Sequence, residues 1–578
     1  MYTTVLTHIV YGWARLHGVR ARRAFLRNAE RCAETQRRVL LRKLGWAAGT
    51  EYGRRHGFAG IDSPGDYRKA VPIVDYQAIS PLVERIVAGE RNILFPPREK
   101  LLMFAMTSGT TATPKYVPVT EHYLAELAEG NFVWGMHLLQ DHASAIEHKI
   151  LHVVSPSREF ATPSGVPCGA ATGLVAESQR KIAHLKYALP PAIYGIGDYG
   201  AKYQCILRLA LQKKISLLIA ANPSTLVALG RRFEEHAPSL IRDLHDGTFE
   251  GAARLDPGLR EEVVRLLRKD PVRARQLERV LAEKGRLLPR DAWPELAVIG
   301  CWTGGTLTPY LSLVTAYWGD KPLRDPGLIA SEGRMTIPVE DGARGGVLDV
   351  ASHFFEFIPY GEEGAGETLL AHELEEGKNY FIILTTSSGF FRYNISDVVQ
   401  VTGRFGDTPV LKFLHKGSRI SSLTGEKITE HQVVEAFREC ERRLGFAVPQ
   451  FTVCPGWGDP PHYFILIEEQ ADGLFSGEAG GRLLGAAGEL FDLALKGMNV
   501  EYRGKRESER LGGPVVRLVA DGSFERDKLA HIAKSGGRME QYKHPYLSPL
   551  PDHCTRFRLS ESRANIQAQT NKGAHRGG

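Results

Sequence analysis

Short apolar runs alternate with helical patterns between about residue 65 and residue 415 of the chain. Each run is short enough to be a strand, and the stretches between runs place their apolar residues at helical spacing. The predicted strands are Leu101–Met106, Lys149–Val154, Ile215–Ala221, Leu296–Cys301 and Tyr380–Thr385. Alternation of this kind predicts a layered α/β domain.

A different pattern begins near residue 417. Thr429 and Gln432 stand at capping-box spacing ahead of a helical pattern that runs to about Leu444. Strands at Gln450–Cys454, His462–Glu468 and near Val515–Val519, with a helix near Arg482–Lys496, complete the pattern. These elements are typical of a small α+β domain.

The length of 578 residues also calls for more than one domain, because single cores stop growing at roughly 250–300 residues. We therefore expect an α/β protein with a large layered N-terminal domain over residues 1–417 and a small, mobile α+β C-terminal domain over 418–562. The polar end of the chain lacks apolar periodicity, which predicts a disordered tail over 563–578.

The net charge of +7 is concentrated at the N-terminus, where residues 1–60 hold twelve Arg and Lys against three Glu. Five apolar residues and one glutamine recur there at helical spacing, at Phe25, Ala29, Cys32, Gln36, Leu40 and Leu44. We interpret this segment as a helix with one buried stripe and a solvated basic face. Contact of that face with an anionic membrane surface, nucleic acid or an acidic partner is the alternative.

The seven cysteines are scattered and never form a C-x-x-C pair, which argues against a disulfide framework and against a structural zinc site. This usage favours a reducing cytoplasm. The first apolar stretch, Val5–Trp13, is interrupted by His8, and no basic residue precedes it, so it is a poor export signal. No apolar run reaches the ~18–20 residues of a membrane span.

The strongest local signal for chemistry follows the first predicted strand. Leu101–Met106 leads into a segment rich in hydroxyl groups, which reads Thr107-Ser108-Gly109-Thr110-Thr111-Ala112-Thr113-Pro114-Lys115. The hydroxyls, the backbone amides around Gly109 and the charge of Lys115 suit a polyphosphate. The spacing is not that of a Walker A loop.

Three further segments follow in the order found in the adenylate-forming enzymes, a superfamily that includes firefly luciferase. They are Ala330-Ser331-Glu332-Gly333, Phe391-Arg392-Tyr393-Asn394-Ile395-Ser396-Asp397-Val398-Val399 and Gln541-Tyr542-Lys543-His544-Pro545. From about residue 35 to 560 the chain resembles, more narrowly, the acyl acid-amido synthetases of the auxin-responsive Gretchen Hagen family, known chiefly from plants and also found in bacteria.

The resemblance implies that ATP and Mg²⁺ activate a carboxylic acid as an acyl-adenylate, which an amine, usually an amino acid, then attacks to give an amide. By the family pattern Lys543 is catalytic, Glu332 helps to bind the metal, and Asp397 accepts hydrogen bonds from the ribose. The nucleotide-binding residues it implies are Thr107, Ser108, Gly109, Thr110, Thr111, Ser331 and Asp397. The implied partners are a small carboxylic acid and an amino acid, with no nucleic acid.

The chain departs from the family pattern at several of these positions. Leu328 replaces a tyrosine, Asn394 and Ser396 replace Arg and Gly, and His544 and Tyr546 replace Thr and Arg. Leucine cannot stack on an adenine ring, and such stacking is worth ~1–3 kcal/mol per base in nucleic-acid readers. We therefore expect altered nucleotide contacts.

Two other functions fit the same residues. One is an acyl-CoA ligase of the same superfamily, in which a thiol replaces the amine. The other is a nucleotide-binding module that has lost catalysis and acts as an interaction protein. The joint presence of Glu332, Asp397 and Lys543 argues against the second.

Overall fold

The structure, a computed structural model, describes residues 17–107, 115–179, 184–304, 310–360, 368–417, 420–448, 450–469, 474–475, 477–535, 544–550 and 553–560. These residues form two compact units, and the chain passes from unit 1 to unit 2 between Leu414 and His415. The passage lies close to residue 417, where the sequence pattern changes. The apolar stretch Val5–Trp13 and the predicted tail over 563–578 lie outside the described residues.

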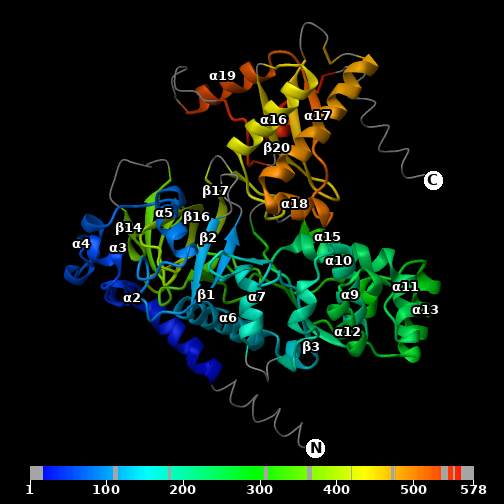
Figure 1. Cartoon of the computed structure of the whole chain (residues 1–578), viewed down its shortest axis with the longest axis horizontal. Coiled ribbons are helices and arrows are strands. Elements are labelled where there is room, and N and C mark those ends of the chain that lie inside the picture. Colours follow the sequence, from blue (N-terminus) through cyan, green and yellow to red (C-terminus); the bar gives the residue numbers. More distant parts are fainter. Residues whose placement is uncertain are drawn as a thin grey trace, which may run out of the picture. The chain divides into compact units, whose positions relative to one another are not determined.

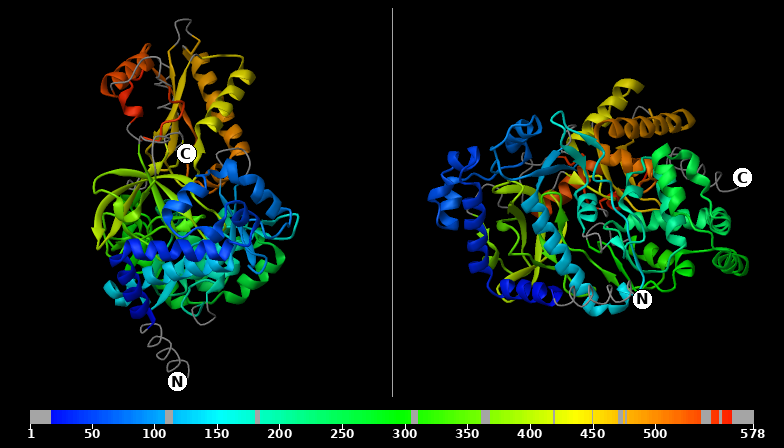
Figure 2. Two further views of the ribbon diagram at one scale, coloured as in Figure 1. Left: turned by 90° about the vertical axis from the view of Figure 1, so that its left-hand side faces the viewer. Right: turned by 60° about the horizontal axis from the view of Figure 1, so that its bottom comes forward.

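A parallel four-stranded sheet forms one part of unit 1, with the order β3-β6-β7-β8. Its strands are β3 (Lys149–His152), β6 (Ile215–Ile219), β7 (Val298–Gly300) and β8 (Leu323–Arg324). Parallel neighbours need long crossover connections, which are usually helical. Helices α9 to α13 gather at one end of the unit, as Figures 1 and 2 show. The helices of this region are α9 (Tyr199–Leu211), α10 (Pro223–Glu235), α11 (Ala237–Asp246), α12 (Pro257–Leu266), α13 (Pro271–Lys284), α14 (Pro289–Ala292) and α15 (Tyr310–Trp318).

A seven-stranded sheet forms a second part of unit 1, with the order β11-β12-β17-β16-β15-β13-β14. Its strands are β11 (Thr336–Ile337), β12 (Gly346–Leu348), β13 (Phe354–Pro359), β14 (Leu369–Leu370), β15 (Asn379–Thr385), β16 (Tyr393–Phe405) and β17 (Thr408–Lys416). A third sheet has the order β2-β1-β5-β4 and consists of β1 (Leu101–Thr107), β2 (Lys115–Thr120), β4 (Phe160–Ala161) and β5 (Pro167–Gly169). The long helix α6 (Glu121–Asp141) follows β2 directly.

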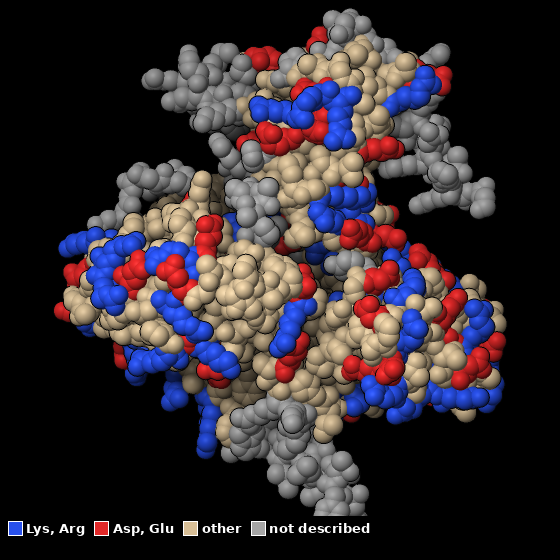
Figure 3. Space-filling view, viewed as in Figure 1, with Lys and Arg blue, Asp and Glu red and all other residues tan. Residues whose placement is uncertain are grey.

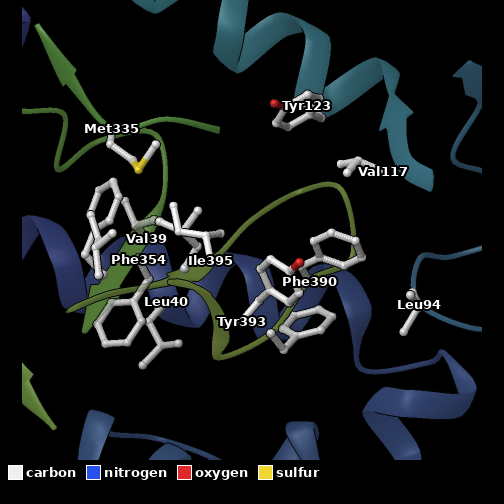
Figure 4. Packing of buried hydrophobic residues seen from close by; sticks show 14 of the residues in the cluster. Val39, Leu40, Leu94, Val117, Tyr123, Met335, Phe354, Phe390, Tyr393 and Ile395 are labelled. Atoms are coloured by element: carbon white, nitrogen blue, oxygen red, sulfur yellow. The ribbon is translucent and has the colours of Figure 1, made fainter. Parts of the chain in front are cut away.

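The N-terminal helices pack on the core of unit 1 through the predicted apolar stripe. Phe25, Ala29, Cys32, Gln36, Leu40 and Leu44 are all buried. The stripe runs through two helices rather than one, because the helix over 17–30 ends in a turn at Arg31 before α2 (Cys32–Ala47). Figure 4 shows Val39 and Leu40 of α2 beside Phe354 of β13 in the same cluster.

The basic face of these helices points outward. The exposed arginines are Arg20, Arg23, Arg27, Arg31, Arg37, Arg38 and Arg42. Figure 3 shows basic side chains along this edge of unit 1. In the described part of the chain, no helix is long and apolar enough to cross a membrane. Unit 1 also contains α3 (Glu51–Arg55), α4 (Pro64–Ala70), α5 (Tyr76–Val87) and α7 (Ala171–Ser178).

Unit 2 contains a three-stranded sheet with the order β20-β21-β22. Its elements are α16 (Glu430–Leu444), β20 (Phe451–Gly456), β21 (His462–Glu468), α17 (Gly477–Met498), α18 (Val500–Glu507), β22 (Val515–Val519) and α19 (Ser523–Ser535). The predicted capping box is confirmed, since the Thr429 hydroxyl accepts the Gln432 N–H and the Gln432 side chain accepts the Thr429 N–H. The expected α/β class with a small α+β part is therefore confirmed.

The cysteines differ from expectation in one respect. Cys454 of β20 and Cys554 form a disulfide that spans 100 residues, with their Cα atoms 6.1 Å apart. This pair was not predicted, because the two residues meet only when the chain after residue 544 returns to β20. Cys32, Cys168, Cys205, Cys301 and Cys440 are free and buried.

Reduction of the disulfide should destabilise unit 2. A cross-link that closes a loop of 100 residues removes unfolded-state entropy worth roughly 4–5 kcal/mol. We expect dithiothreitol to lower the unfolding midpoint of the wild-type protein in scanning calorimetry. The Cys454→Ala/Cys554→Ala variant should show no response to dithiothreitol, and an oxidised protein whose digest lacks the linked peptide would contradict the pairing.

Candidate active site

The hydroxyl-rich segment lies between two paired strands. Met103, Phe104 and Ala105 of β1 are buried, which fixes the strand in the core. At the end of β1, Thr107 pairs with Lys115, the first residue of β2. The pairing thus brings both ends of the Thr107–Lys115 segment together. The Thr107 side chain and the predicted phosphate-binding residues Ser108, Gly109, Thr110 and Thr111 lie outside what the structure describes.

Lys115, the charged residue at the end of this segment, contacts α5 (Tyr76–Val87). The Lys115 ammonium group lies 5.2 Å from the centroid of the Tyr76 ring, within cation–π range. The Tyr76 hydroxyl in turn accepts the Tyr116 N–H at 2.7 Å. These contacts tie the start of β2 to α5.

Ser331 and Glu332 form the two-residue turn between β9 (Ile329–Ala330) and β10 (Gly333–Arg334). The Tyr123 hydroxyl, from α6, donates a hydrogen bond to the Ser331 carbonyl at 2.6 Å. Glu332 is only 8% exposed. Burial, and after it the charge of Glu332, raises the pKa of Tyr123 well above its ordinary value, so the hydroxyl stays protonated and able to donate.

Two glycines allow this turn to lie close to its neighbours. A Cβ atom at Gly333 would lie 2.7 Å from Nε2 of His353, and one at Gly130 would lie 2.4 Å from Cδ of Arg334. Gly130 thus lets the buried Arg334 cross α6. The Arg334 guanidinium donates to Asn131 Oδ1 at 2.7 Å and to the Pro326 carbonyl at 2.7 Å.

Asp397 lies at an irregularity in β16. Phe381 of β15 pairs with Val398, whereas Ile383 pairs with Asn394, so β16 carries two extra residues between these pairs. Ser396 adopts φ +61° in this bulge, and its N–H donates to Asn394 Oδ1 at 2.8 Å. Bulges re-aim side chains next to functional sites. Asp397 is 3% exposed.

Arg392 anchors the start of β16. It also has a positive φ, +48°. Its guanidinium donates two hydrogen bonds to Glu356 of β13, at 2.9 and 3.0 Å, and one to the Val71 carbonyl at 2.7 Å. Val74 continues the attachment, since its N–H donates to the Arg392 carbonyl and its carbonyl accepts the Asn394 N–H. The backbone ahead of Asp397 is therefore fixed on both sides.

The structure brings Glu332 and Asp397 into one neighbourhood. Burial raises the pKa of Tyr393 well above its ordinary value, and the charge of Glu332 and, more weakly, that of Asp397 add to the shift. Tyr76 contributes to the same shift, which places α5 there as well. Two carboxylates predicted from distant motifs thus act on one tyrosine.

In the described part of the chain, no group of three or more His, Cys, Asp and Glu side chains is arranged to hold a metal. A single buried carboxylate such as that of Glu332 is still compatible with Mg²⁺. Mg²⁺ usually keeps several waters and binds through one or two carboxylates plus the phosphates of a substrate. Glu332 matches that donor set.

Lys543 lies outside the described residues, but the segment that follows it is fixed to β20 of unit 2. The His544 ring lies 2.9 Å from the Phe451 carbonyl and 3.1 Å from the Thr452 hydroxyl. Tyr546 packs on the Phe451 ring, with centroids 5.1 Å apart. The departures at His544 and Tyr546 thus have contacts of their own in unit 2.

The segment Gly425-Glu426-Lys427 of unit 2 places one buried carboxylate, that of Glu426, between two half-buried residues. Glu426 is fully buried and accepts the N–H groups of Leu423 and Thr424, both at 2.7 Å, and the Tyr463 hydroxyl. Its carboxylate thus binds the backbone just before Gly425. In this structure Glu426 has a structural role.

Three residues around the Ser331–Glu332 turn were not predicted from the sequence: Tyr123, Glu126 and His353. Tyr123 and Glu126 belong to an ordinary amphipathic helix, and His353 precedes a buried strand. No motif marks them. Only the contacts between elements identify these residues.

The chain is similar to known proteins over most of its length. Models of the GH3 family match along the chain: the N-terminal domain over residues 21–323, the central domain over 346–416 and the C-terminal domain over 431–551. A jasmonoyl–L-amino acid synthetase of Nicotiana attenuata is 26% identical over 88% of this chain and 90% of its own length. An indole-3-acetic acid-amido synthetase of Arabidopsis thaliana is also 26% identical, over 89% of this chain and 93% of its own length.

The solved structure of AtGH3.15, an acyl acid amido synthetase in complex with 2,4-DB, has a TM-score of 0.66 and 21% identity, and the match covers 95% of this chain and 98% of that one. The chain therefore has the fold of that acyl acid amido synthetase. Because the family models match most of its length, the chain belongs to the GH3 family.

The bulge at Ser396 predicts the effect of restoring glycine. A non-glycine residue in the left-handed region lowers the stability of the fold by about 1–2 kcal/mol. Glycine avoids this strain, but its greater freedom in the unfolded chain lowers the stability by about 0.4–1 kcal/mol. Ser396→Gly should therefore raise the free energy of unfolding by up to about 1 kcal/mol in urea titration.

Asn394→Ala removes the acceptor of the Ser396 N–H and should lower the same free energy by about 1 kcal/mol. Loss of stability in Ser396→Gly together with no change in Asn394→Ala would argue against the bulge.

Proposed function

We propose that the protein is an ATP-dependent acyl acid-amido synthetase, a ligase that forms a carbon–nitrogen bond. It activates a small carboxylic acid as an acyl-adenylate, with release of pyrophosphate, and conjugates the acyl group to an amine such as an amino acid. The observation that carries the proposal is the match to the three GH3 family models along the chain, in which Glu332 lies buried in the β9–β10 turn and Asp397 lies buried at the bulge in β16. The names of its relatives support the reaction, since they are amido synthetases for jasmonate and indole-3-acetic acid.

Each proposed role follows from the chemistry of the side chain. Asp397, a buried carboxylate, accepts hydrogen bonds from the ribose hydroxyls, and charge-assisted bonds of this kind are roughly twice as strong as neutral ones. The Ser331 turn lies against the nucleotide. The phosphates bind at Thr107, Ser108, Gly109, Thr110 and Thr111, where hydroxyls and amides can donate.

Activation brings a carboxylate to an α-phosphate, so two anions must approach each other. Lys543 supplies positive charge to the phosphate in the transition state, where such charge has the largest effect on rate. Glu332 holds Mg²⁺. The metal, when bound, neutralises phosphate charge.

We also propose that residues 1–417 form the adenylating domain and residues 418–562 a small mobile domain that carries Lys543. Movement follows from the reaction, since one lysine must reach the phosphates and then withdraw before an amine attacks. We propose the cytoplasm as the compartment on the basis of the five free cysteines, and the Cys454–Cys554 pair would be reduced there. The proposed partners are the acid and the amine alone, with the basic N-terminal face in solvent.

Asp397→Ala should weaken ATP binding about 10- to 100-fold, because hydrogen bonds to a charged acceptor are worth about 1.5–3 kcal/mol. Titration calorimetry would measure ATP and acid affinities separately. The acid affinity should change little. Asp407→Ala, an exposed aspartate in the turn after β16, is the matched control. Equal ATP affinity in Asp397→Ala and the control would remove Asp397 from the site.

Lys543→Ala should lower the rate of adenylate formation by ~10²-fold or more, because one charge aimed at the transition state is removed. The assay supplies acid, ATP, Mg²⁺ and hydroxylamine, and records pyrophosphate and acyl hydroxamate. A panel of aryl, indole and fatty acids, each with mixed amino acids, identifies the substrate pair. Arg482→Ala, which removes an exposed charge of α17, should retain the wild-type rate.

The products of the same assay separate the alternatives. Release of inorganic phosphate instead of pyrophosphate would indicate an acyl-phosphate route and contradict the proposed function. Pyrophosphate release that gives product only with coenzyme A would establish an acyl-CoA ligase. A protein that binds ATP and releases no pyrophosphate with any acid would be a binding module.

A further inference from the structure

A buried ion pair joins α2 and α6 beside the candidate site. Lys43 of α2 is 2% exposed, and its ammonium group lies 2.7 Å from Oε1 of Glu126 and 2.8 Å from the Ser387 hydroxyl. The Ser387 hydroxyl donates to the same carboxylate oxygen at 2.9 Å. The Lys43–Glu126 pair therefore joins three segments that are far apart in the sequence: α2, α6 and the turn that contains Ser387.

One arm of this cluster leads to the Ser331–Glu332 turn. Oε2 of Glu126 lies 3.4 Å from Nδ1 of His353. The His353 ring stacks on Tyr123, with centroids 6.2 Å apart and an interplanar angle of 16°. His353 Nε2 faces Gly333, next to Glu332, and the Tyr123 hydroxyl bonds the Ser331 carbonyl. The turn thus lies against the His353 ring at Gly333 and accepts a hydrogen bond from Tyr123 at Ser331.

The other arm leads to Asp397. Ser387 belongs to the turn between β15 and β16, and its carbonyl accepts the Thr120 hydroxyl at 2.9 Å. Within this turn the Thr386 N–H donates to the Phe390 carbonyl. Phe390 leads directly into Arg392 and the bulge. Ser387 therefore lies in the turn that leads into Arg392 and the bulge.

The first two turns of α6 connect these arms to the phosphate segment. Thr120 caps α6, and its hydroxyl also accepts the Tyr123 N–H. The chain immediately before it is β2, which starts at Lys115. Thr120, Tyr123 and Glu126 thus lie on the same face of one helix, at spacings of three residues. The Ser331–Glu332 turn and the β15–β16 turn both make hydrogen bonds with this short stretch.

The charges themselves argue for a positioning role. Burial raises the pKa of Glu126, but Lys43 and His353 outweigh burial and hold it at about 2, so the carboxylate is ionised in the working range of pH. Apolar residues of similar size often stabilise a core as well as a buried ion pair does. What the pair adds is direction, since Oε1 of Glu126 accepts hydrogen bonds from both Lys43 and Ser387, while Oε2 lies beside the His353 ring.

We propose that Tyr123 and Glu126 are positioning residues for adenylate formation. Tyr123 holds the Ser331–Glu332 turn, and Glu126 keeps that turn in register with the segment that carries Asp397, through His353 on one side and Lys43 and Ser387 on the other. The inference rests on the proposed function. It goes further by naming residues that contact neither nucleotide nor acid and still set nucleotide affinity.

Tyr123→Phe tests the first arm, because it keeps the ring and removes only the hydrogen bond to Ser331. We expect the Kd for ATP with Mg²⁺ to rise about fivefold, as one neutral hydrogen bond warrants, with the Kd for the acid unchanged. The control is Tyr380→Phe, which loses a hydroxyl that accepts the Glu375 N–H at 3.1 Å, away from the site. Its ATP affinity should equal that of the wild type.

Glu126→Gln tests the second arm, and we expect a larger rise in the Kd for ATP than in Tyr123→Phe, about tenfold or more, because a charged interaction is lost. The double variant should be weakened by less than the product of the single effects, since both residues act on one turn. Where Glu126→Gln fails to fold, Ser387→Ala replaces it, with an expected rise of about threefold or more.

The readouts separate positioning from folding. A merely structural defect lowers the fraction of protein that binds while the Kd of that fraction stays the same. Unchanged Kd values for ATP in folded Tyr123→Phe and in folded Glu126→Gln or Ser387→Ala would overturn the inference while the proposed function stands. A wild-type protein that does not bind ATP would overturn both, and is recognised before any variant is compared.

Discussion

The Lys43–Glu126 pair constrains where the parts of unit 1 can lie. A buried charge without a partner costs several kcal/mol, so α2, α6 and the β15–β16 turn must meet at one point in the folded state. Arg392 imposes the same kind of constraint on β13 through Glu356. Apolar packing is tolerant of small shifts, whereas hydrogen-bonded charges are directional. The core gives unit 1 its stability, and these pairs fix its register around the candidate site.

Sequence patterns were sufficient for the elements whose own residues determine them. β21 and β22 were predicted residue for residue, and α16 was predicted from its cap, because apolar alternation and capping are local signals. The break at Arg31 was not predicted. The stripe on α2 and on the helix before it continues across the break, so apolar spacing alone reads as one helix. Cys454–Cys554 was missed for the opposite reason, since nothing local links two residues 100 positions apart.

The residues of the candidate site also fall into two groups, those that motifs predicted and those that only the folded structure identifies. Motif order pointed to Glu332 and Asp397, and the structure brings both to Tyr393. Tyr123, Glu126 and His353 carry no motif, because their contribution is a set of contacts between segments. A side chain that touches a substrate is restricted in chemical type, which a sequence displays. One that holds another residue in place can be of many types, and its role appears only in three dimensions.

The departures from the family pattern bear on whether chemistry is retained. Ser396 stands where the pattern has glycine and adopts the left-handed conformation that glycine favours, at a cost that a decayed site would have no reason to bear. Asn394, the neighbouring departure, accepts the Ser396 N–H and so offsets part of that cost. His544 likewise gains contacts with Phe451 and Thr452 in place of those of a threonine. Random loss would leave such positions unsupported. Asn394 and His544 have hydrogen-bond partners of their own, so the bulge at Asp397 and the segment that begins at His544 are both supported.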